Sequence, residues 1–217
     1  MANIFPRWTN WLAIKAVIAV ICIKAAVILG VTYYCTPKYT RVGYMPTQPV
    51  PFDHSLHVGQ LGMDCRYCHT GVEQSSHSNV PATQTCMNCH SQVKAGSAKL
   101  AEVRKSWETG NPVSWVRIHK SPDYVYFNHA VHVNRGVSCA SCHGKVNEMR
   151  VVWHDQSQSM GWCLDCHRNP EKNLRPLNEV YNMDWEADSY HAQIKQGMQF
   201  VKEWNVNPPQ NCAGCHR

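Results

Sequence analysis

The sequence predicts a domain of loops and short α-helices with little or no β-sheet, preceded by one transmembrane helix. Three observations support this. Ten of the twelve cysteines lie in five Cys-x-x-Cys-His pentads, which are spread over residues 65–216. Twelve prolines and twelve glycines are scattered along the chain, a composition typical of turns. Residues 12–35 form an apolar run that is long enough to cross a ~30 Å hydrocarbon core as a helix.

The pentads have the spacing of c-type haem attachment, in which two thiols bond the haem vinyl groups and the adjacent histidine reaches the iron. Structural zinc sites usually take two Cys-x-x-Cys pairs per metal and do not require the following histidine, and five is an odd number of pairs. Dithiol redox sites need a helix N-terminus in a thioredoxin-like context, which the sequence lacks. We therefore predict five covalently bound haems c. The attachment residues are Cys65, Cys68, His69, Cys86, Cys89, His90, Cys139, Cys142, His143, Cys163, Cys166, His167, Cys212, Cys215 and His216.

With five haems, the chain is too short to form a large hydrophobic core from its side chains alone. Without the first 50 of the 217 residues, about 33 residues remain per haem, too few for a large core of side chains alone. The porphyrins must therefore form the apolar core, and the predicted fold class is a multihaem cytochrome c. The formal charge of +6 falls to near zero when five ferric haems, each with two propionates, add roughly −5. The basic residues are scattered and match no recognition motif, so nucleic acid is not an expected partner.

The N-terminal apolar run predicts an uncleaved signal anchor. It exceeds the roughly 7–15 residues of a signal peptide, and no Ala-x-Ala-like site follows it. Trp8, Trp11, Tyr33 and Tyr34 lie at its two ends, where aromatic belts occur. The flanking charges are too evenly distributed to orient the helix, but c-type haems mature outside the bacterial inner membrane. We expect a single-pass inner-membrane protein with a cytoplasmic N-terminus and a periplasmic haem domain.

Three residues of the anchor have no obvious role. Lys24 lies near the middle of the span, where an isolated charge costs a few kcal/mol. Its long side chain either snorkels from a tilted helix or faces a carboxylate or lipid headgroup inside a larger membrane complex, and we hypothesise the latter. Cys22 is expected to be a small apolar packing residue. Cys35 follows Thr-Tyr-Tyr, which lacks the small residue that precedes a lipidated cysteine.

An internal duplication follows the Pro-rich linker. The block Phe52-Asp-His-Ser-Leu-His57 precedes the first pentad, and Phe127-Asn-His-Ala-Val-His132 precedes the third. Such self-similarity predicts two copies of a two-haem module with a fifth haem appended. The expected organisation is a cytoplasmic N-terminus (1–11), anchor helix (12–35), linker (36–51), di-haem modules (52–120 and 121–175), and a C-terminal helix with the fifth haem (176–217).

Two longer helices are expected in the haem domain. One covers residues 97–108 and ends near Gly110 and Pro112. The other covers residues 189–204, with Ser189 as its N-cap. Each pentad is expected to begin a short helical turn, because its histidine must project at a fixed angle.

Eight histidines remain for the second axial position, which a low-spin electron-transfer haem fills with His or Met. The two repeated blocks supply four of them at i, i+3 spacing. Two such side chains lie on one face of a helical turn and could bind two neighbouring haems. The four predicted distal ligands are His54, His57, His129 and His132.

The fifth distal ligand has several candidates. His119, just before the second block, is the first choice, and Met160 is the second. A thioether ligand would raise the potential of that haem relative to a bis-histidine one. His191 and His154 are further candidates, whereas His77 lies in a polar Ser-rich loop and is expected to be solvated.

The block Phe-Asn-His-Ala-Val-His followed by a pentad resembles the cytochrome c3/c7 group of small multihaem proteins. In that group the first histidine of the block binds the haem of the next pentad, and the second binds a later one. The resemblance therefore implies His54 for the Cys65 haem and His129 for the Cys139 haem. It leaves the haems of His57 and His132 unassigned.

Nearly the whole chain resembles the membrane-anchored pentahaem subunit of bacterial alternative complex III. The likeness rests on the single anchor and on strings such as PFDHSLHVGQLGMDCRYCHT, DYVYFNHAVHVNRGVSCASCHG and SMGWCLDCHRNPE. It implies an electron-transfer subunit, not an enzyme by itself, of a quinol-oxidising respiratory complex in the lipid bilayer. The implied partners are an iron–sulfur, molybdopterin-like periplasmic subunit, polytopic quinol-binding membrane subunits, and a monohaem cytochrome c or a terminal oxidase.

Two other functions compete with this one. A stand-alone membrane-anchored quinol dehydrogenase feeding a periplasmic reductase would need a quinone pocket beside one haem near the membrane. A catalytic reductase of the nitrite type would need a haem with an open position, often marked by a pentad that ends in lysine. All five pentads here end in histidine, which favours electron transfer over catalysis.

Overall fold

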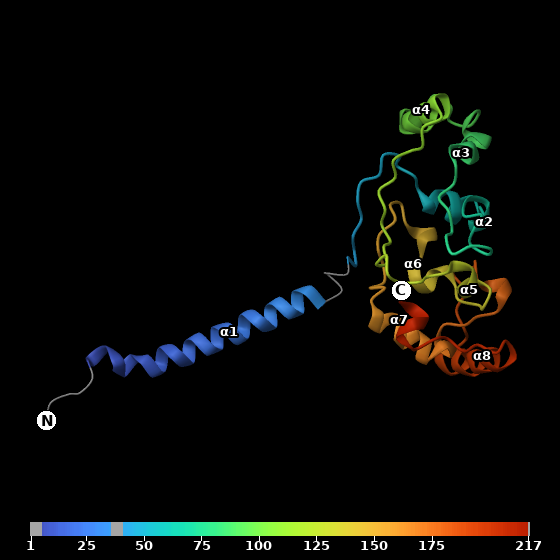
Figure 1. Ribbon diagram of the computed structural model, residues 1–217. Coiled ribbons are helices and arrows are strands. Elements are labelled where there is room, and N and C mark those ends of the chain that lie inside the picture. The colour runs from blue at the N-terminus through green and yellow to red at the C-terminus, as the bar shows by residue number, and fades with distance from the viewer. Residues whose placement is uncertain (1–5, 36–40, 217) are drawn as a thin grey trace. The chain divides into compact units, whose positions relative to one another are not determined.

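The computed structural model describes residues 6–35 and 41–216 and divides the chain into two compact units, Met1–Arg41 and Val42–Arg217 (Figure 1). The first unit contains helix α1 (Leu12–Cys35), which follows a 3-10 turn, η1 (Arg7–Trp11). A 24-residue helix extends about 36 Å, enough to cross a bilayer core. Within the described chain, Trp8–Cys35 is the one helical stretch that meets this requirement of length and apolarity. The expected N-terminal apolar helix is confirmed.

The second unit consists of short helices joined by loops. Two isolated β-bridges, Val125–His216 and Val137–Leu174, are the strand-like pairings between its described residues. The expectation of loops and short helices with little or no sheet is therefore confirmed. The α-helices are α2 (Cys65–Cys68), α3 (Thr83–His90), α4 (Ala101–Thr109), α5 (His129–Val133), α6 (Cys139–His143), α7 (Met160–Arg168), α8 (Tyr190–Glu203) and α9 (Cys212–Cys215). The single turns are η2 (Ser55–Gln60, of π type) and the 3-10 turns η3 (Ala98–Leu100), η4 (Val146–Glu148), η5 (Pro170–Lys172) and η6 (Leu177–Glu179).

Both longer helices lie where the sequence places them. Helix α4, with η3 directly before it, ends at Gly110, whose φ of 72° is left-handed and suits a residue without Cβ. Helix α8 begins after Ser189, whose hydroxyl accepts a hydrogen bond from the Ala192 N–H at 3.1 Å. That bond satisfies one of the unpaired donors of the first turn.

The helices of the second unit are spread along its length. Figure 1 shows α3 and α4 at one end, α7 and α8 at the other, and α2, α5 and α6 between them. Helix α3 packs on α4, and α8 packs on η5. The second contact requires Gly197, because a Cβ at this position would overlap the backbone carbonyl of Glu171. This close contact joins the C-terminal helix to the segment that follows the fourth pentad.

The side chains of the second unit form only a small core among themselves. Val72, Val133 and Val180 pack together, with Tyr181 against them. Eight hydrophobic residues are buried among the described residues. A core of this size agrees with the expectation that porphyrins supply most of the apolar interior.

Candidate haem-binding sites

The pentads of Cys65, Cys139 and Cys212 each begin a short helix, as expected, whereas those of Cys86 and Cys163 lie three residues into α3 and α7. Four of the five helices carry a capping side chain directly before their first residue, and each cap accepts a hydrogen bond from a backbone N–H of the first turn. The caps are Asp64, Ser138, Ser159 and Asn211. On such a turn the two thiols, at i and i+3, lie on one face, and the histidine follows at the end of the helix.

Thiol contacts show that the first pentad lies between the second and the third. All twelve cysteines are free. The thiols of Cys65 and Cys139 are hydrogen-bonded to each other, which lowers the pKa of Cys65 and raises that of Cys139. Burial raises the pKa of Cys68, and the nearby Cys86 raises it further. The first pentad therefore contacts the third through Cys65 and approaches the second through Cys68.

The third, fourth and fifth pentads also approach one another through their thiols. Burial, with Cys166 and Cys163 close by, raises the pKa of the Cys142 thiol to about 12. Burial also raises the pKa of Cys163, and Cys166 and Cys215 add to the effect. The pentads thus follow one another in space in an order that differs from their order in the chain. Named by their first cysteines, the order is Cys86, Cys65, Cys139, Cys163 and Cys212.

Most of the candidate ligands have one ring nitrogen already engaged. In six histidines Nδ1 lies 2.7–2.9 Å from a backbone carbonyl oxygen. A carbonyl only accepts, so Nδ1 carries the proton and Nε2 keeps the lone pair that can bind a metal. The six are His57, His69, His90, His129, His132 and His167.

Three pairs of rings lie at the separation that a shared metal requires. A metal–nitrogen bond to histidine is about 2 Å long and the ring centre lies about 1 Å beyond the nitrogen, so two rings on opposite faces of one metal have centres about 6 Å apart. The measured separations are 6.2, 6.4 and 6.2 Å. The pairs are His57–His90, His129–His143 and His132–His167.

The two repeated blocks have the same internal geometry. Phe52 meets His54 edge-on at 4.7 Å and stacks on His57 at 4.4 Å. Phe127 meets His129 edge-on at 4.7 Å and stacks on His132 at 4.9 Å. The match holds although the first block lies at a π turn and the second in an α-helix. One phenylalanine therefore orients both histidines of each block.

His54 occupies the position in the first block that His129 has in the second. Burial lowers the pKa of His54 to about 4, and the nearby His69 lowers it further. Its Nδ1 is buried without a hydrogen-bond partner. A neutral buried imidazole beside the first pentad histidine is suited to bind a metal there.

His119 is placed against the third pentad. Its Nε2 lies 3.2 Å from Nδ1 of His143, with the two rings nearly perpendicular. The ring beside His216 is that of Tyr124, at 5.6 Å between centres. The position of His119 therefore gives no support to the prediction that it completes the fifth haem.

The other candidates for the fifth site are found in different places. Met160 begins α7 with 65% of its surface exposed. His191 is exposed in the first turn of α8, whereas His154 is buried, with its ring 5.2 Å from that of His119. His77 is exposed, as predicted.

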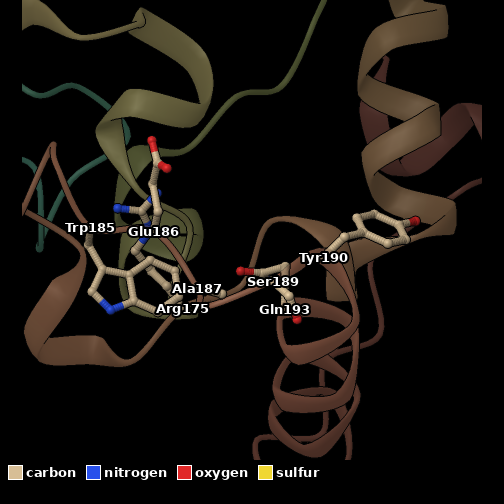
Figure 2. A pocket seen from close by; sticks show the side chains of 7 residues that line it. All are labelled: Arg175, Trp185, Glu186, Ala187, Ser189, Tyr190 and Gln193. Carbon is tan, nitrogen blue, oxygen red and sulfur yellow. The ribbon is translucent and has the colours of Figure 1, made fainter.

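Two open cavities lie outside these histidine pairs. One, of about 250 Å³, is lined by Arg175, Trp185 and the first turn of α8, and Figure 2 shows Tyr190 pointing away from Arg175 and Trp185. The Arg175 guanidinium lies over the Trp185 ring at 4.9 Å. The other cavity, of about 280 Å³, lies beside Cys65. No pentad histidine lines either cavity, and within the described residues no three His, Cys, Asp or Glu side chains converge on a metal site of another kind.

The fold and these sites define a multihaem c-type cytochrome. The chain belongs to the family of cytochrome c7 and related cytochromes c, whose model matches residues 50–106 and 125–217. Membership implies covalently bound haem c, with thioethers to pentad cysteines. The cysteine pairs, the neutral histidines and the 6 Å ring separations fit that group, whose axial ligands are histidine or methionine.

Curated relatives share this character. The chain is 37% identical over 173 residues to the multihaem cytochrome c subunit of menaquinone reductase from Nitratidesulfovibrio vulgaris, covering 78% of this chain and 67% of that protein. It is 24% identical over 196 residues to cytochrome c-552 of Maridesulfovibrio salexigens, and 32% identical over 93 residues to cytochrome c-552 of Bacteroides fragilis. The match to the Maridesulfovibrio protein covers 69% of this chain and 39% of that longer protein. The match to the Bacteroides protein covers 39% of this chain and 18% of that longer protein.

The structure adds contacts that sequence reasoning missed. The carbonyls that hold His69, His129 and His167 belong to Asn79, Ser76 and Pro209. Two of the three lie more than 40 residues from the histidine that they contact. Backbone carbonyls carry no sequence signal, so no motif could have revealed these partners.

Proposed function

We propose that this chain is a pentahaem c-type cytochrome, the electron-transfer subunit of a quinol-oxidising membrane complex of the alternative complex III type. The observation that carries the proposal is the continuous series of five pentads, in which each approaches the next through its thiols. When bound, the haems supply one-electron oxidation and reduction. A series of neighbouring sites suits a relay rather than a single reaction centre.

Four sites are proposed to have two histidine ligands. The pairs His57–His90, His129–His143 and His132–His167 follow from their ring separations. The pair His54–His69 follows from the equivalence of the two blocks and from the proximity of the two rings. Each block then spans two sites, because its first histidine serves the next pentad and its second serves the pentad after that. His216 is the proximal ligand of the fifth site.

The protein groups hold and orient the ligands and perform no acid–base chemistry. Carbonyls at Nδ1 fix the ring plane and the tautomer, and they increase electron donation from Nε2. The phenylalanine of each block limits rotation of its two histidines. Such preorganisation reduces the change in structure that accompanies a change in iron charge.

Helix α1 is the basis for proposing that the chain is anchored in a membrane. An uncleaved anchor with the N-terminus in the cytoplasm would hold the haem domain at the periplasmic surface of a bacterial inner membrane. There it would receive electrons from an iron–sulfur partner beside polytopic quinol-binding subunits and pass them to a monohaem cytochrome c or a terminal oxidase. A second candidate is a complex of the menaquinone reductase type, because a relative with 37% identity bears that name.

Purification of the tagged chain from its native membrane in mild detergent, followed by mass spectrometry of the associated proteins, tests the proposal. We expect a large iron–sulfur protein, polytopic membrane subunits and a monohaem cytochrome c. Recovery of the chain alone, or with only a periplasmic reductase, would contradict it and favour a stand-alone quinol dehydrogenase. Recovery with an iron–sulfur subunit and a polytopic subunit that reduce menaquinone would favour the second candidate.

A further inference from the structure

His143 differs from other pentad histidines in the partner of its Nδ1. In His69, His90 and His167 this nitrogen faces a backbone carbonyl. In His143 it faces Nε2 of His119 at 3.2 Å. The ring planes cross at 88° with their centres 4.3 Å apart, so a nitrogen at the edge of one ring points at the other ring's nitrogen. This is the geometry of a hydrogen bond between two side chains and not of stacking.

The pairing of His143 with His129 determines the direction of that bond. Their ring centres lie 6.4 Å apart, the separation of a shared metal, and Nδ1 of His143 is the nitrogen that faces His119, so Nε2 is the one left for the metal. An imidazole that binds a metal through Nε2 carries its proton on Nδ1. Hence His143 donates from Nδ1 and His119 accepts through Nε2.

His119 lies beside the loop that contains Trp153 and Asp155, with its ring centre 5.2 Å from that of His154. Arg117 donates to its carbonyl at 3.1 Å. Asp155, two residues beyond Trp153, accepts hydrogen bonds from the side chains of Trp153 and Gln156 at 3.2 and 2.7 Å. The same carboxylate lies so close to Gly144 that a Cβ there would collide with it. The loop beside His119 is thereby packed on the residue that follows His143.

We propose that His119 is a positioning residue that accepts the Nδ1 proton of His143 and so makes this ligand more electron-rich than the pentad histidines whose Nδ1 faces a carbonyl. An imidazole nitrogen is a stronger acceptor than a carbonyl oxygen, and a more polarised ligand stabilises ferric over ferrous iron. The reduction potential of this site is therefore held below the value that a carbonyl acceptor would give. The inference rests on the proposed function, because it requires His143 to bind a haem iron.

The test uses the full-length chain with its haems in detergent and three variants. His119→Leu removes the acceptor, His119→Gln offers an amide oxygen in its place, and Gln199→Leu alters an exposed polar residue of α8 as a control. Haem number is measured by intact mass, ligation by low-temperature electron paramagnetic resonance and carbon monoxide binding, and potentials by spectroscopic redox titration. We expect His119→Leu to keep all five haems six-coordinate and to move one component to higher potential. His119→Gln should move the same component less, and Gln199→Leu should move none.

Three results would overturn the inference. A haem that becomes high-spin and binds carbon monoxide would make His119 an iron ligand, as the sequence alone suggested. Unchanged potentials and resonance signals in both His119 variants would show that the hydrogen bond has no effect on the site. Loss of one haem from both variants would show a role in assembly alone. Failure of the proposed function is distinguishable, because an unaltered chain would then carry fewer than five haems or copurify with no redox partner.

Discussion

At the scale of single residues, the structure relates the histidines of each repeated block to particular pentads. His57 donates to the carbonyl of Asp53 at 2.8 Å, and its ring centre lies 6.2 Å from that of His90. His132 donates to Asn128 and lies 6.2 Å from His167. Each second histidine of a block therefore lies beside the second pentad of its own module. Removing one of these side chains should therefore affect one haem site only, which tests the assignment of that histidine to its pentad.

Replacing His57 with alanine should create one five-coordinate haem. The thioether bonds at Cys86 and Cys89 are untouched, so five haems should still be attached, but the site of His90 loses its second ligand. We expect about one-fifth of the haem to become high-spin and to bind carbon monoxide, measured by difference spectroscopy against pyridine haemochrome content. His77→Ala is the matched control and should bind none. An unreactive His57→Ala chain would remove His57 from the ligand set.

The pentads were recognisable in the sequence, and the distant partners of their histidines were not. A pentad is recognisable because thioether formation requires a fixed local spacing. The assignment of His57 to the Cys86 pentad depends on how the intervening loop folds, and the two histidines are separated by 33 positions. The contact of His119 with His143 was not predicted for the same reason, since it joins residues 24 positions apart.

At the scale of helices, local sequence signals predicted the longer helices but not the short 3-10 turns. Gly110 and Ser189 correctly placed one end each of α4 and α8, because a left-handed C-cap and a hydroxyl N-cap act within one turn. The 3-10 turns η4, η5 and η6 were not predicted. They are three residues long, too short to show a periodic pattern.

The contact of α8 with η5 gives a stability prediction. Gly197→Ala should destabilise the haem-loaded chain by about 1–3 kcal/mol, because the added methyl meets the backbone of Glu171, which cannot rotate away as a side chain could. The measurement is the midpoint of thermal unfolding by calorimetry. Gly161→Ala in α7 is the control, since a Cβ there meets nothing within 4 Å, and its midpoint should hold or rise slightly. Equal midpoints for the two variants would contradict the packing argument.

Lys24 gives a prediction for the anchor helix. It lies roughly 17 Å along α1 from either end, which is farther than a lysine side chain reaches. If it faces a carboxylate or lipid headgroup within a complex, Lys24→Leu should reduce the polytopic subunits recovered in detergent purification several-fold. Lys15→Leu, near the start of the helix, should leave recovery unchanged. Unchanged assembly in Lys24→Leu would refute the idea.

At the scale of the whole molecule, the haem number is the decisive property. We expect the mature chain to carry five haems by intact mass and to keep them during chelator treatment, because thioether bonds are covalent whereas zinc would be removed. Its isoelectric point should lie near neutrality instead of at the basic value implied by a polypeptide charge of +6. Isoelectric focusing of the haem-loaded chain measures this. A chelator-sensitive metal in place of haem would contradict the pentad interpretation.

The repeat of the two blocks was visible in the sequence, but the spatial order of the pentads was not. The repeat of Phe-x-His-x-x-His predicted that two equivalent blocks exist, and their equal ring geometry agrees. The adjacency of Cys65 and Cys139 joins pentads that are 74 positions apart. Such a contact is a product of tertiary folding, and no local pattern encodes it.

The chain order of the paired histidines has a consequence for biogenesis. In each of the four proposed pairs the distal ligand precedes its pentad, as His54 precedes His69 and His132 precedes His167. A polypeptide exported from an N-terminal anchor emerges in that same direction. Each haem would therefore meet a waiting second ligand at the moment of its attachment. The maturing chain could complete its sites one after another, and a half-exported intermediate need not expose a reactive open-coordinate iron to oxygen.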